Sequence, residues 1–117
     1  MENKANQLYD LTELRATAGG DESFIQDMIR IFITENEKVL QEIGQLTVTG
    51  SYISAKAMLH KMKISFMVMG VTKVMDVIEQ IERLDLATAE KSVISDHFHT
   101  LGRLLEKVNE QLRMVLT

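Results

Sequence analysis

The sequence predicts an all-α fold, an antiparallel four-helix bundle with an additional short N-terminal helix. The 117 residues include no proline and only 5% aromatic residues, whereas proline breaks helices and aromatic and β-branched residues dominate strands. Apolar residues recur at three- and four-residue steps through most of the chain, which is the spacing of one helix face. With 45% hydrophobic and 26% charged residues, a chain of this length is expected to form a single domain, residues 1–117.

The first two helices are predicted between residues 11 and 46. Apolar residues at helical spacing indicate a short first helix over residues 11–18, and Gly19 and Gly20 then supply a backbone that ends helices. Asp21 is a suitable N-cap for a long second helix that runs to about Leu46. The apolar face of this second helix comprises Phe24, Ile25, Met28, Ile29, Phe32, Val39, Ile43 and Leu46.

Three further helices are predicted in the rest of the chain. Ser51, at the end of the interruption TVTGS, is able to cap a third helix that stops near Gly70. A fourth helix is marked by Val74, Ile78, Ile81 and Asp85. After the break LDLATAE, a fifth helix has apolar residues that alternate in steps of four and three, as in a bundle seam. These residues are Ile94, Phe98, Leu101, Leu105, Val108, Leu112 and Val115.

The third predicted helix has a core face and an unusual outward face. At about 100° of rotation per residue, six apolar residues fall within an arc of roughly 100°, the width of a core-facing stripe. They are Ala55, Met58, Leu59, Met62, Phe66 and Met69. His60 lies opposite the middle of that arc and is therefore predicted to be exposed. The same outward face carries Ile53, Lys56, Lys63, Ile64 and Met67.

An exposed histidine beside cations has a specific chemistry. Histidine has an unperturbed pKa of about 6.5, so a neutral ring nitrogen is available near pH 7 to attack an electrophile such as phosphorus. Lys63 at i+3 and Lys56 at i−4 share the face of His60 and are candidates to neutralise a phosphoryl group. A surface histidine without function is the alternative that these residues leave open. Three outward apolar residues, Ile53, Ile64 and Met67, are expected to form one contiguous patch, which is the candidate partner surface.

The segment AMLHKMKISFMVMG, residues 57–70, resembles the motif of the histidine phosphotransfer (HPt) family. That motif reads histidine, any residue, leucine, lysine, glycine, serine, and then a glycine five residues after the serine. The corresponding residues are His60, Lys61, Met62, Lys63, Ile64, Ser65 and Gly70. Because the segment YDLTELRATAGGDESFIQDMIRIF also resembles the start of this family, the resemblance covers about residues 9–115. One departure is Ile64, which stands where the family has a glycine that leaves room for an incoming partner.

The resemblance implies a four-helix bundle that relays a phosphoryl group between receiver-domain aspartates. His60 would be the phosphoacceptor and Lys63 the phosphoryl-stabilising cation, while Ser65 and Gly70 would be the helix-end positions that shape the site. No cofactor is expected to be bound by the chain itself, because the receiver holds the Mg²⁺ ion. Lys56 has no firm place in the motif, so its role is inferred from geometry alone. Glu82 on the next helix is a candidate neighbour of His60, but its match to the family is weak and it is not counted among the site residues.

The composition limits the classes of partner and the cellular compartment that we expect for this chain. A net charge of −4 with dispersed basic residues argues against nucleic-acid binding, and the lack of cysteine excludes disulfides and thiolate metal sites. A polar N-terminus, and no apolar run near the roughly 20 residues of a membrane span, predict a cytoplasmic chain without membrane insertion. The glycine-rich ATP-binding motifs of a kinase are missing. The resemblance implies that the partners are response-regulator receiver domains, a hybrid sensor histidine kinase or both, and we expect the chain to be a monomer.

Other interpretations stay open beside this one. The same bundle is able to act as an adaptor that docks a receiver without phosphorylation, and Ile64 is the residue that favours this hypothesis. A metal site of His60, His97 and His99 is disfavoured, because residues at i and i+2 of a helix face different sides. His97 is instead expected to be a hydrogen-bonded boundary histidine and His99 an exposed one. The chain is either free-standing or the C-terminal domain of a hybrid kinase.

Overall fold

The computed structural model describes residues 6–117, and this part of the chain contains five helices and no strand. The helices are α1 (Thr12–Ala18), α2 (Glu22–Val48), α3 (Tyr52–Val68), α4 (Thr72–Arg83) and α5 (Lys91–Val115). The predicted all-α class is therefore confirmed. Among these helices, none is both long and apolar enough to cross a membrane.

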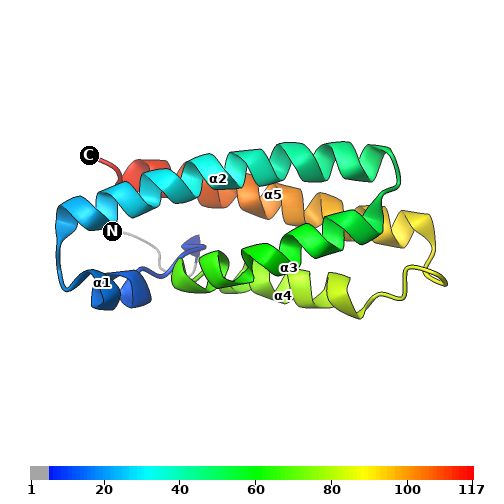
Figure 1. Cartoon of the computed structure of the whole chain (residues 1–117), viewed down its shortest axis with the longest axis horizontal. Helices are drawn as coiled ribbons and strands as arrows, with labels where there is room; N and C mark the ends of the chain where they lie inside the picture. Colours follow the sequence, from blue (N-terminus) through cyan, green and yellow to red (C-terminus); the bar gives the residue numbers. More distant parts are fainter. Residues whose placement is uncertain (1–5) are drawn as a thin grey trace.

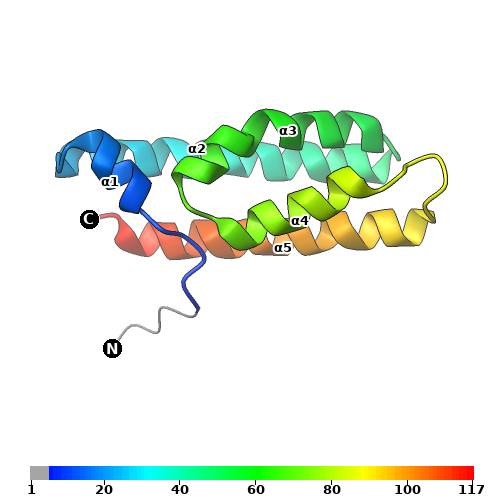
Figure 2. The same cartoon turned by 90° about the horizontal axis from the view of Figure 1, so that it is seen from below.

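The four longer helices lie side by side as a helical bundle (Figure 1). In Figure 1 the chain reverses direction at each link from α2 to α5. Each of these helices packs against its neighbours in the chain, and α5 returns to pack against α2. The short helix α1 contacts α2 near one end of the bundle (Figure 2).

The observed helix boundaries agree with the prediction at some ends and correct it at others. The side chain of Asp21 accepts a hydrogen bond of 3.2 Å from the backbone N–H of Phe24, so its N-cap role is confirmed. The prediction that Ser51 caps α3 is wrong, because its hydroxyl pairs with the Thr49 hydroxyl at 2.9 Å instead. Asp85 lies beyond the end of α4, where its carboxylate accepts from the Ala87 N–H at 3.0 Å and forms a turn.

The core contains most of the apolar residues that the periodicity predicts, but Phe24 in the first turn of α2 is 41% exposed. In α5 the whole stripe is buried except Val115 at the end of the helix, which is half-buried. The predicted core face of α3 is divided between four fully buried residues and two half-buried methionines. The buried ones are Ala55, Leu59, Phe66 and Met69, and the half-buried ones are Met58 and Met62. Because this face packs in the core, the opposite face of α3 points to solvent.

A buried asparagine pair joins α2 to α5, and the sequence pattern did not reveal it. The Asn36 amide donates to the Asn109 side-chain oxygen at 2.9 Å and to the Leu105 carbonyl at 3.2 Å. The Asn109 amide in turn donates to the Ile33 carbonyl at 3.3 Å. Both side chains are almost completely buried. A buried polar group is costly without its partner, so this pair favours one register between the two helices.

The turn between α3 and α4 depends on Gly70. This glycine has a φ of +62°, and its N–H bonds to the Met67 carbonyl while the next N–H, of Val71, reaches back to Phe66. This is a Schellman motif, the usual left-handed end of a helix. A Cβ atom added at Gly70 would clash with the backbone oxygen of Asp10. The position therefore requires glycine both for its backbone conformation and for space.

We expect Gly70→Ala to destabilise the fold more than Gly50→Ala. Both glycines have positive φ, +62° and +73°, and an L-residue in that region costs roughly 1–2 kcal/mol. Only Gly70 also faces a backbone clash, since nothing lies within 4 Å of a Cβ at Gly50. Urea unfolding of the two variants measures the difference. Equal losses of unfolding free energy would contradict the close approach of the Asp10 backbone.

Candidate functional site

His60 lies midway along α3, and its ring points away from the core. Its side chain is 72% exposed, whereas Leu59 and Ala55 on the other face of the helix are completely buried. The exposure predicted from the helical periodicity is therefore confirmed. An exposed ring is accessible to a macromolecular partner as well as to small molecules.

Glu82, in the last turn of α4, joins His60 and Lys63 of α3 into one cluster. One carboxylate oxygen, Oε2, lies 3.3 Å from Nδ1 of His60, and the other, Oε1, lies 2.5 Å from Nζ of Lys63. The carboxylate is 26% exposed and the Lys63 side chain 29%. We call these three residues the His60–Lys63–Glu82 cluster. Its geometry requires α3 and α4 to pack side by side, as Figure 2 shows.

The cluster keeps Glu82 ionised. The hydrogen bond from Lys63 is the main cause that lowers the pKa of Glu82 below its ordinary value of 4.5, and the hydrogen bond from His60 acts in the same direction. Partial burial opposes them by disfavouring the charged form. An ionised carboxylate is only an acceptor, so Nδ1 of His60 must carry the proton in the contact. In the neutral ring, the lone pair is then on Nε2.

Lys63 supplies a positive charge next to this ring. An ammonium group has three N–H donors, and the contact with Glu82 uses one of them. The side chain leaves α3 one turn after His60, so it is on the same face of the helix. Lys63 is therefore placed to donate to an anion that reaches the free side of the ring.

Lys56 has a different position from the one expected. Its ammonium donates to the backbone carbonyls of Glu82 at 3.2 Å and Leu84 at 3.1 Å. These carbonyls lie at the C-terminal end of α4, where helix carbonyls lack partners within the helix. In this structure Lys56 therefore binds carbonyl groups at the end of α4. Its spacing from His60 had predicted a contact with a phosphoryl group instead.

The remaining motif residues lie farther along α3. Ser65 is exposed, and Gly70 follows the end of the helix. At 1.5 Å of rise per residue, Gly70 is about 15 Å from His60 along the axis of α3. Gly70 thus acts through the turn into α4 rather than by contact with the ring. No structural observation gives Ser65 a part in the cluster.

The outward apolar residues do not form one patch. Ile53, Ile64 and Met67 are 78%, 75% and 62% exposed, as predicted. Ile64 and Met67 are neighbours at i and i+3, but Ile53 is eleven residues from Ile64, about 16 Å along the helix. The idea of a single contiguous surface is therefore wrong. Ile53 lies on one side of His60 along α3, and Ile64 and Met67 lie on the other.

Ile64 also lines an apolar groove between α2 and α3, which the sequence pattern did not reveal. The groove has a volume of about 210 Å³. Ile31 of α2 lies across it and is 54% exposed. The groove residues are Leu14, Met28, Ile31, Phe32, Glu35, Met62, Ile64, Ser65, Val68 and Met69. Apolar side chains from two helices therefore continue the outward surface of α3 toward α2.

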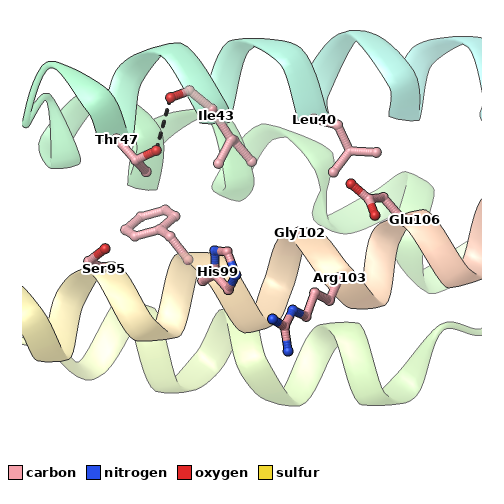
Figure 3. Close-up of a pocket in the computed structure, with 10 residues that line it drawn as sticks. Leu40, Ile43, Thr47, Ser95, His99, Gly102, Arg103 and Glu106 are labelled. Atoms are coloured by element: carbon pink, nitrogen blue, oxygen red, sulfur yellow. Dashed lines mark hydrogen bonds between the residues drawn. The ribbon is translucent and has the colours of Figure 1, made fainter.

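The other two histidines lie on α5. His97 is half-buried and donates from Nδ1 to the Val93 carbonyl at 2.8 Å, and His99 is exposed, so both expectations are confirmed. Figure 3 shows His99 beside a groove between α2 and α5, where Gly102 faces Leu40. Within residues 6–117, no three histidine or carboxylate side chains are grouped as metal ligands would be.

The electrostatics of the cluster predict that Lys63→Met raises the pKa of Glu82. The lysine hydrogen bond is the largest cause of the lowered pKa, and partial burial, which raises the pKa, remains in the variant. The hydrogen bond from His60, which lowers the pKa, also remains, so the pKa should rise toward its ordinary 4.5. A pH titration of the ¹³C carboxyl signal measures it. An unchanged pKa would show that Lys63 and Glu82 are not paired in solution.

The same shift predicts a pH-dependent contribution to stability. A carboxylate with a lowered pKa in the folded state stabilises the fold above its unfolded pKa, and the contribution is lost as the pH falls through the folded value. We expect Glu82→Gln to destabilise the protein at pH 7, with the difference from wild type shrinking below about pH 4.5. Glu79→Gln controls for the loss of one negative charge on α4. A difference that grows on acidification would contradict the sign.

Comparisons of the chain with models of protein families, with curated proteins and with solved structures find no match. The site is therefore described by its own chemistry. It consists of an exposed histidine with a free Nε2, a carboxylate on the opposite ring nitrogen, and a cation on the same helix face.

Proposed function

We propose that this chain is a histidine phosphotransfer domain, a phosphoryl carrier that relays the group between receiver-domain aspartates and His60. The observation that carries this proposal is the His60–Lys63–Glu82 cluster. Its histidine is 72% exposed, Glu82 contacts Nδ1, and Lys63 is one turn away. The motif resemblance in residues 57–70 supports the same conclusion independently of the side-chain geometry.

The finer architecture belongs to the same proposal. We infer an antiparallel four-helix bundle made of α2 to α5, with α1 outside it. Two observations support this arrangement: α5 packs against both α4 and α2, and short links join successive helices. Links of this kind are typical of neighbouring antiparallel helices. In such a bundle a histidine midway along one helix is held on a rigid element.

The proposed transfer is a single displacement at phosphorus. The Nε2 lone pair of His60 attacks the phosphorus of an aspartyl phosphate, forming an N–P bond while the P–O bond to the aspartate breaks. The aspartate leaves as a carboxylate, and the ring becomes positively charged. Glu82, hydrogen-bonded to Nδ1, stabilises that charge, and Lys63 neutralises phosphoryl oxygens. The reverse displacement returns the group to another receiver.

This chemistry determines what the partner domain would have to supply. A receiver domain would supply the aspartate and the Mg²⁺ ion, so no cofactor is assigned to this chain. Ile64, Met67 and the apolar groove reaching Ile31 are the contact surface nearest to the motif, with Ile53 at a separate contact. The proposal implies a cytoplasmic monomer without kinase activity, fed by receivers or a hybrid sensor kinase.

Incubation with phosphorylated receivers and Mg²⁺ tests the phosphoacceptor. We expect acid-labile, alkali-stable phosphate on the wild type and on His99→Gln, and none on His60→Gln. His99 is the matched control because it is also exposed on a helix. Equal labelling of His60→Gln, or no label from any receiver in a broad panel, would contradict the proposal.

The same assay measures the contribution of Lys63. Removing one preorganised donor from a charge-stabilising site costs on the order of 10²-fold in rate, so Lys63→Met should slow phosphoryl uptake by about that factor. Lys61→Met is the control, because Lys61 is an exposed lysine next to His60. If both variants slowed uptake equally, general charge rather than a specific contact would be responsible.

A receiver-docking module without phosphorylation is the second candidate. The observation that favours it is Ile64, a 75% exposed apolar residue in place of the family glycine. Under this alternative, receivers bind wild type and His60→Gln with equal affinity and leave no phosphate on either. Ile64→Ala should then weaken binding. Binding without label in the assay above would select this function.

A further inference from the structure

The backbone at Glu82 is held by a second lysine of α3. While Lys63 contacts the carboxylate of Glu82, Lys56 donates to the backbone carbonyl of the same residue at 3.2 Å. It also donates to the Leu84 carbonyl at 3.1 Å. Lys56 is half-buried, so its ammonium is held between α3 and the end of α4.

These contacts are at a vulnerable part of the bundle. The carbonyls of the last turn of a helix have no intrahelical partners, and helix ends fray. At this end of α4, the N–H of Leu84 bonds to the Ile81 carbonyl, and Lys56 provides the bonds to Glu82 and Leu84. A positive charge at a helix C-terminus also interacts favourably with the helix dipole.

We propose that Lys56 is a positioning residue for His60: it holds the last turn of α4 so that the Glu82 carboxylate stays against Nδ1. Its use in phosphoryl transfer rests on the proposed function, but its effect on the ring does not. Without the ammonium, the last turn of α4 loses two bonds and Glu82 moves away from the ring for part of the time. The Nδ1 proton then loses its acceptor, and Nε2 is no longer held as the free nitrogen.

The tautomer of the His60 ring tests this role without phosphorylation. Long-range ¹H–¹⁵N correlation at a pH where the ring is neutral reports which nitrogen carries the proton. In the wild type the signal of an unprotonated Nε2 should dominate, and in Lys56→Met it should fall toward the level in Glu82→Ala, where the acceptor is absent. Lys61→Met removes a charge beside His60 without touching α4 and should match the wild type.

Two further substitutions test whether the donors of Lys56 hold the tautomer of the His60 ring. Lys56→Arg keeps a charged donor, and Lys56→Gln keeps an uncharged one. A guanidinium has several N–H donors for the two carbonyls, so the arginine variant should keep the wild-type tautomer. Glutamine should give an intermediate ratio, since its amide is shorter and uncharged. A lower melting temperature in Lys56→Met and Lys56→Gln with an unchanged tautomer would overturn the proposal, because Lys56 would then only stabilise the fold. If Lys56→Met shows the expected change of tautomer but the wild type takes up no phosphoryl group, only the proposed function is contradicted.

Discussion

The site depends on the turn at Gly70, because this turn sets which residues of α3 and α4 face each other. Gly70 ends α3 in a left-handed conformation and lies so close to the Asp10 backbone that no side chain fits there. The chain therefore enters α4 in one orientation. His60 is ten residues before this glycine and Glu82 twelve after it, so they meet where the two helices run side by side. A change at the turn would alter the chemistry about 15 Å away.

The two halves of the bundle serve different purposes. The α5 stripe and the buried Asn36–Asn109 pair hold α2 and α5 in one register, while the α3–α4 pair presents charged groups to solvent. This division leaves the histidine accessible but keeps its neighbours ordered. Phosphoryl transfer depends mainly on positioning and charge neutralisation, and the exposed face of α3 offers a histidine with a carboxylate and a cation beside it.

The exposure of His60 was predictable from the sequence, but most of its contacts were not. Periodicity within one helix determines which residues face the core, so the exposure of His60 and the burial of the α5 stripe from Ile94 to Leu112 agree with the prediction. The contacts of Glu82 and Lys56 depend on the register between α3 and α4, which helical spacing does not encode. For the same reason, the groove at Ile31 and the asparagine pair were missed. Ser51 does not cap α3 because its hydroxyl pairs with the hydroxyl of Thr49.

The proposed phosphotransfer is tested most directly by identifying which atom is bonded to phosphorus after incubation with phosphorylated receivers. Glu82 contacts Nδ1 of His60 and leaves Nε2 free, so phosphorylated protein should carry the phosphorus on Nε2. Heteronuclear correlation between ring protons, ring nitrogens and phosphorus on the phosphorylated protein identifies the bonded atom. A phosphoryl group on Nε2 would agree with the arrangement of the His60–Lys63–Glu82 cluster. Phosphorus on Nδ1, or on a residue other than His60, would contradict it.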